Sequence, residues 1–180
     1  LAYHIPGAGT PDSFAIEAAS RILSSGQSSR LYRRMVYEKQ IALQAAGSGA
    51  FLEDSGLFFF FAILNAGQKP EDGESELAAE IERLKNELVT DAELEKAKTQ
   101  LIAEATVGQQ TVQQRADALG FAATVLGNPE LVNEEITRLQ AVTAADIQRV
   151  AKKYLSKENR SVIYMLPESM RAAGAEGGAK

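Results

Sequence analysis

The sequence of 180 residues contains no cysteine and a single histidine, His4. The lack of cysteine excludes disulfides and thiolate chemistry, but it leaves the compartment open, because secreted domains of this size also fold without bridges. A single imidazole, without a second histidine or a cysteine, supplies too few of the usual ligands of a protein zinc site. We therefore expect His4 to be a half-buried strand residue and not a ligand.

Long apolar runs and an excess of positive charge are also absent. No apolar run approaches the ~20 residues that a membrane-crossing helix needs. The net charge is -5, and the basic residues are scattered over segments that also carry Glu and Asp. Such a distribution offers no basic patch to a phosphate backbone. We therefore expect no membrane span and no nucleic-acid partner.

The first part of the chain predicts a strand followed by a helix. Residues 1–5 are apolar apart from His4 and end at Pro6-Gly7, which suits a short strand entering a turn. Thr10, with proline at the first helical position and an acid in the first turn, is a typical helix start. Alanines recur at helical spacing along the inner face, and Gly26 ends the helix.

The stretch from Gly26 to Leu43 reads Gly-Gln-Ser-Ser-Arg-Leu-Tyr-Arg-Arg-Met-Val-Tyr-Glu-Lys-Gln-Ile-Ala-Leu. We expect Ser28 to cap a second helix, whose apolar residues share one face, and the chain then to become extended. Taken alone, the Ser-Ser-Arg-Leu-Tyr motif is a helix cap followed by an apolar pair, which favours a structural role.

The next two segments predict a β-hairpin. Residues 42–51 and 57–64 are extended, and Glu-Asp-Ser-Gly at 53–56 is typical of a turn. Four consecutive phenylalanines occupy 58–61, and in a strand two of them must point to each face. Either the sheet is covered on both sides, or it presents an apolar face to another domain.

From Pro70 onward the apolar spacing is helical. Three stripes are expected to face the core: Leu77, Ile81, Leu84 and Leu88; Leu94, Ala97, Leu101 and Ala105; Val112, Ala116, Leu119, Ala123 and Leu126. Thr90 and Thr143 each precede an acid at the third helical position, and Asn128-Pro129 resembles another helix start. A last strand is predicted over 161–166.

This order keeps strands and helices apart, which favours an α+β fold. We expect an antiparallel sheet of about four to five strands, with helices packed mainly on one face. One domain is expected over 1–167, with a flexible tail at 168–180. Because Leu1 lies within a predicted strand, we interpret the chain as a fragment of a longer polypeptide.

The order of elements over roughly residues 1–167, together with the Ser-Ser-Arg-Leu-Tyr signature and the Glu-Lys-x-Ile-Ala step into a strand, resembles the insulinase/pitrilysin-like zinc metallopeptidases, which include mitochondrial processing peptidase. In that family zinc is bound by a His-x-x-Glu-His helix in the first, catalytic domain. With one histidine this chain cannot supply both imidazoles. The resemblance thus implies no catalytic, cofactor or metal residue in this chain, and zinc in a missing N-terminal domain.

A second functional element of the family is an arginine followed seven residues later by a tyrosine, which stabilises the oxyanion. Val36 and Leu43 occupy the corresponding positions here, near the end of the second helix and at the start of the next strand. Neither side chain can donate a hydrogen bond. The resemblance therefore implies the C-terminal, non-catalytic domain, with no catalytic centre of its own.

Such a domain would wall the peptide-binding chamber of a zinc metalloendopeptidase and support its zinc-bearing half. Its implied partners are that half of the same polypeptide, a peptide substrate, and a second copy or a paralogue in a dimer. The alternative is a structural or partner-binding subunit without proteolytic activity. The resemblance implies a soluble protein of the bacterial periplasm or cytoplasm, and the sequence does not decide between them.

Overall fold

The computed structural model describes residues 1–166, in which a four-stranded antiparallel sheet has the order β2-β3-β1-β4. The strands are β1 (Ala2–Pro6), β2 (Ala42–Ala50), β3 (Ser55–Leu64) and β4 (Arg160–Ser161). The predicted α+β class and antiparallel sheet are thus confirmed. The flexible tail expected at 168–180 lies outside the described residues.

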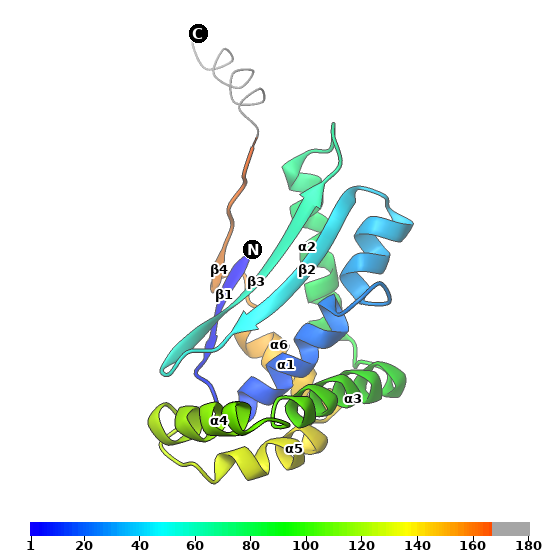
Figure 1. Cartoon of the computed structure of the whole chain (residues 1–180). Helices are drawn as coiled ribbons and strands as arrows, with labels where there is room; N and C mark the ends of the chain where they lie inside the picture. The colour runs from blue at the N-terminus through cyan, green and yellow to red at the C-terminus, as the bar shows by residue number, and fades with distance from the viewer. Residues whose placement is uncertain (167–180) are drawn as a thin grey trace.

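The helices gather on one face of the sheet, as Figure 1 shows, with α1, α2 and α6 next to it. They are α1 (Pro11–Ser24), the π-helix η1 (Tyr32–Glu38), α2 (Pro70–Asn86), α3 (Asp91–Val107), α4 (Val112–Thr124), α5 (Leu131–Ala141) and α6 (Ala144–Tyr154). Small buried side chains, Ala15, Ala18 and Ala19, let α1 lie close to the strands. The core is the layer between these helices and the sheet.

The hairpin of β2 and β3 divides its phenylalanines between the two faces, as predicted. Phe58 and Phe60 are buried, whereas Phe59 and Phe61 are exposed. Gly47 on β2 makes room for the Phe60 ring, because a Cβ atom there would lie 2.4 Å from a ring carbon. The inner face of the sheet is therefore closely packed, and its other face is open.

Most helix starts match the sequence, with two exceptions. The Thr90 and Thr143 hydroxyls accept hydrogen bonds from the third helical N–H groups, and both capping boxes are complete. Ser28 does not cap the second helix; its hydroxyl accepts a hydrogen bond from Lys96 instead. Asn128 accepts from the Glu130 N–H in the turn before α5, which begins only at Leu131.

The prediction of which residues of α4 face the core is wrong. Val112 is 86% exposed and Leu119 47%, while Ala122 is buried. Apolar residues lie around most of this helix, so their spacing does not fix the buried side. The helix packs mainly on α5. Leu88 also differs from the prediction: it is 58% exposed because α2 ends at Asn86.

The last predicted strand is shorter than expected. Its paired residues are Arg160 and Ser161, which face Tyr3 and Ala2 of β1. Residues 162–166 continue as an extended apolar segment without a paired strand. A strand needs a neighbour for its backbone N–H and C=O groups, and β1 reaches no farther along this segment than Ala2.

A cluster of charged and polar side chains connects the start of α1 to α6. Asp12 at the start of α1 accepts hydrogen bonds from Arg149 at 2.7 Å, Lys153 at 2.9 Å and Tyr154 at 2.8 Å, all on α6. Desolvation raises the pKa of the Asp12 carboxyl, but these three donors outweigh it and hold the pKa at about 2. The cluster therefore fixes α6 against α1.

Candidate functional site

The signature segment before η1 is connected to α3 by a partly buried ion pair. Arg30 is 9% exposed, and its Nε and Nη2 atoms donate to the two carboxylate oxygens of Glu93 at 2.7 and 2.8 Å. Hydrogen bonding from Arg30 is the main reason that the pKa of Glu93 falls to about 2. Glu93 also completes the capping box of α3 with Thr90. The arginine of the motif thus has a structural role, as the motif alone suggests.

Two further ion pairs connect this region to α2. The Glu76 carboxylate accepts from Arg34 at 2.8 Å and lies 3.0 Å from the Lys39 ammonium. Farther toward the start of α2, Glu74 pairs with Arg160 of β4 at 2.9 Å. The acidic first turns of α2 therefore hold neighbouring elements in place. Sequence reasoning missed these pairs, because their partners lie far away along the chain.

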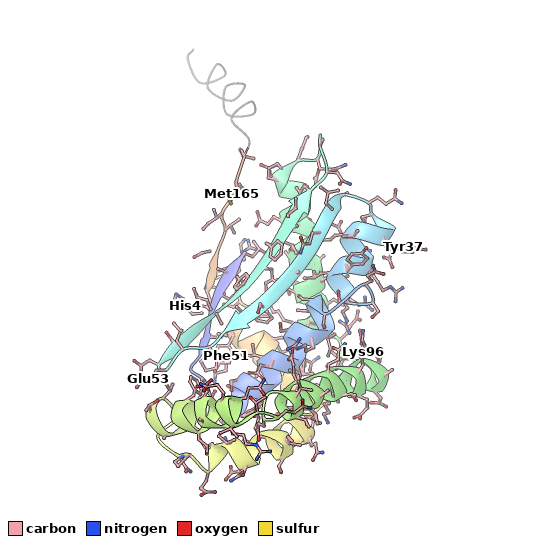
Figure 2. All side chains as sticks on the ribbon, in the orientation of Figure 1. His4, Tyr37, Phe51, Glu53, Lys96 and Met165 are labelled. Atoms are coloured by element: carbon pink, nitrogen blue, oxygen red, sulfur yellow. The ribbon has the colours of Figure 1, made fainter. Side chains whose placement is uncertain are left out.

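Val36 and Leu43 occupy the elements that the sequence predicted. Val36 lies in η1, half-buried against the core, and Leu43 lies at the start of β2, 69% exposed. The pairing register shifts between Ala42 and Gln44, so Leu43 is the extra residue of a β-bulge. Tyr37, the nearest hydroxyl in sequence, is 75% exposed and points away from the domain (Figure 2). That this chain supplies no catalytic residue stays a prediction.

The face of the sheet opposite the helices carries a row of apolar side chains. We call this set the open face: Leu57, Phe59, Phe61 and Ile63, which are 44%, 41%, 38% and 50% exposed. The register places Ala46, Ser48 and Ala50 of β2 beside them. A patch of large apolar side chains on an exposed surface often marks a site of interaction with another protein or a ligand.

His4 lies on the same side of the sheet, beside Leu57 of β3, and is labelled in Figure 2. It is exposed, not half-buried as the sequence suggested, because β1 alternates and its inward positions are Tyr3 and Ile5. Among residues 1–166, no group of three or more His, Asp or Glu side chains is arranged to hold a metal ion. None of the helices in that range is long and apolar enough to cross a membrane.

A polar cavity of about 720 Å³ lies among α1, α3, α5 and the end of β2, and no sequence pattern predicted it. Its carboxylates are Glu17, Glu104 and Glu135, and Arg21 pairs with Glu104. Burial raises the pKa of Glu17 to about 7, and the Glu135 charge adds to the shift while Arg21 opposes it. Burial also raises the pKa of Glu135. The cavity therefore brings together two carboxyl groups that resist ionisation.

An antiparallel sheet covered by helices on one face, with a signature segment held by ion pairs, is the arrangement that the resemblance to the zinc metallopeptidases implies. Residues 1–101 match the model of the peptidase M16 inactive domain. The chain belongs to this family.

Three relatives support the assignment. The zinc protease PqqE of Helicobacter pylori is 28% identical over 169 residues, which are 93% of this chain and 37% of that protein. A protein described as a "putative zinc protease" from Bordetella pertussis is 29% identical with a TM-score of 0.80, over 89% of this chain and 88% of the solved one. The inactive peptidase domain of a similarly described protein from Bordetella parapertussis is 28% identical with a TM-score of 0.80, over 89% and 86%. This chain thus spans little more than a third of the curated relative.

We expect the isolated chain to bind no stoichiometric zinc and to cleave no peptide, since it has one histidine and no cysteine. Metal analysis after dialysis against a metal-free buffer tests this, with a casein digestion assay alongside it. One tightly held zinc per chain would contradict the prediction.

Proposed function

We propose that this domain walls the peptide-binding chamber of a zinc metalloendopeptidase and supports a zinc-bearing N-terminal half of the same polypeptide. The open face is the observation that carries the proposal. Its four large apolar side chains are between 38% and 50% exposed, and apolar side chains gathered on an exposed surface are typical of interaction sites and ligand-binding grooves. A domain of an M16 protein with such a face is suited to enclosing a substrate that another half cleaves.

The division of labour follows from what the chain can and cannot supply. The described residues hold no suitable group of metal ligands, so the zinc would be bound by the other half. Val36 and Leu43 cannot donate hydrogen bonds to an oxyanion, so that role would also fall to another domain. This domain would therefore contribute part of the chamber's shape, its apolar surface and support for the zinc-bearing half.

The alternative, a structural or partner-binding subunit of a peptidase-like assembly with no proteolytic activity, is not favoured. The relatives near 28% identity are described as zinc proteases or their inactive domains. A dimer, with a second copy or with a paralogue, belongs to the proposal and would close the chamber from the other side. The bacterial periplasm and cytoplasm are both compatible with a cysteine-free chain.

Replacing Phe59 with aspartate in the full-length polypeptide should lower casein hydrolysis at least about tenfold, because a charge would be desolvated on the open face. The thermal midpoint should change little, since Phe59 is already 41% exposed. Zinc content should be unchanged.

Leu88→Asp is the matched control. Leu88 is 58% exposed on the loop after α2, away from the open face, and its replacement should leave hydrolysis unchanged. If Phe59→Asp and Leu88→Asp are equally active, the open face does not serve the chamber and the proposal fails.

A further inference from the structure

The sheet contains a slot of the width of one strand, between the second half of β3 and the segment 162–166. At the near end of the slot, Leu1 and Phe60 exchange two backbone hydrogen bonds, at 2.8 and 2.7 Å. On the other side of β1, Ala2 faces Ser161. The flanking segments are therefore two strand spacings apart there, about 9.6 Å. Figure 1 shows the N-terminus between β3 and the chain that leaves β4.

Beyond Leu1 the flanking segments continue, and a largely apolar cavity of about 500 Å³ lies between them. Its lining includes Leu1, residues 60–64 and residues 162–166. On its far side β3 pairs with β2 up to Leu64, so this part of β3 is a strand with one free edge. The Tyr164 hydroxyl donates to Glu74 of α2, which holds the outer segment near the domain.

The segment 162–166 is itself built as a strand that lacks a partner. Its sequence, Val-Ile-Tyr-Met-Leu, has high strand propensity, yet Ile163 is 79% and Met165 94% exposed. An extended apolar segment with unpaired backbone groups invites pairing with another strand. A single strand placed in the slot would therefore pair with β3 on one side and with residues 162–166 on the other.

We propose that the slot is filled by the four residues that precede Leu1 in the longer polypeptide, as a direct continuation of β1. This inference rests on the proposed function only in that it requires the longer polypeptide. A continuing strand is favoured over a separate one because Leu1 already fixes its register and its entry costs no association entropy. Extended, four residues span about 14 Å.

The register assigns a partner to each of these residues. Hydrogen-bonded pairs alternate along an antiparallel ladder, so the residues two and four positions before Leu1 would bond to Ala62 and Leu64. The residues one and three positions before it would bond to Ile163 and Met165. Side chains alternate as well, so the residue two positions before Leu1 would point inward with Tyr3 and is expected to be apolar.

The test adds Val-Thr-Val-Thr directly before Leu1 of the present chain, which places valine at both inward positions. Amide hydrogen exchange is then followed at Ala62, Leu64, Ile163 and Met165. These amides should exchange at least about tenfold more slowly than in the unextended chain. The control extension is Val-Thr-Pro-Thr, in which proline cannot donate to Ala62 and should remove most of the gain.

Equal protection with both extensions, or none with either, would overturn the proposal. Protection of the unextended chain that grows with protein concentration would also overturn it, because a second copy would then occupy the slot. The assay contains no zinc half and measures no hydrolysis, so its failure is distinct from failure of the chamber proposal, which Phe59→Asp tests.

Discussion

Replacing Arg30 with alanine is expected to lower the free energy of unfolding by roughly 2 to 4 kcal/mol. The Arg30 side chain is 8% exposed, and its guanidinium donates two hydrogen bonds to Glu93. Its loss would leave that carboxylate, 31% exposed, without its main partner, and Glu80 nearby would also lose a favourable charge. The connection between the signature segment and α3 would be lost with it. Urea denaturation followed by circular dichroism measures the change.

Arg33→Ala is the matched control for this experiment. Arg33 is three residues away, and its side chain is 65% exposed, 3.5 Å from Glu38. An exposed pair of this kind contributes about 0 to 1 kcal/mol. If Arg30→Ala costs no more than Arg33→Ala, the buried ion pair does not hold this region together. Arg30→Lys should fall between them, because an ammonium cannot make the two parallel bonds.

In the signature segment, the secondary structure could be predicted from the sequence, but the contacts of its arginine could not. The glycine break, the hairpin turn and most of the helix caps are local signals, and they predicted the order of elements correctly. The family followed from the resemblance of that order and of the signature motif, and it is confirmed. The partner of Arg30 is Glu93, 63 residues away, and no local pattern connects the two. The sequence therefore indicated that the motif was structural, but it did not show what the arginine binds.

The misplaced α4 face and the shortened last strand have a shared cause. Apolar spacing shows that a segment can bury a face, but the choice of face depends on which neighbour is present. Leu119 and Ile163 both fit their predicted patterns, and both are exposed because nothing within residues 1–166 covers them. The division of the four phenylalanines between the two faces of the sheet was predictable, because side chains alternate along a strand. Whether the second face is covered or open was not, because that depends on the neighbours of the sheet.

The carboxyl groups of the polar cavity predict a fall in stability as pH rises. Glu17 titrates at about 7 in the folded chain, against 4.5 for the ordinary group. Between these values the folded state holds a proton that the unfolded state has released, so the stabilisation is full below about pH 4.5 and is lost as pH rises through 7. The difference corresponds to roughly 3 kcal/mol at most. Glu135 faces the same cavity, and its raised pKa acts in the same direction.

Replacing Glu17 with glutamine should therefore raise the free energy of unfolding at pH 8 by roughly 1 to 3 kcal/mol, while changing it little at pH 4.5. Glutamine keeps the shape of the protonated acid and cannot ionise, and Arg21 retains Glu104 as its partner. Urea denaturation at several pH values measures the effect, with Glu53→Gln in the exposed β2–β3 turn as the control. Glu53→Gln should follow the parent curve at every pH. A Glu17→Gln curve that also falls in parallel with the parent between pH 5 and 8 would show that Glu17 is already ionised in the folded chain, and that the cavity admits enough water to solvate it.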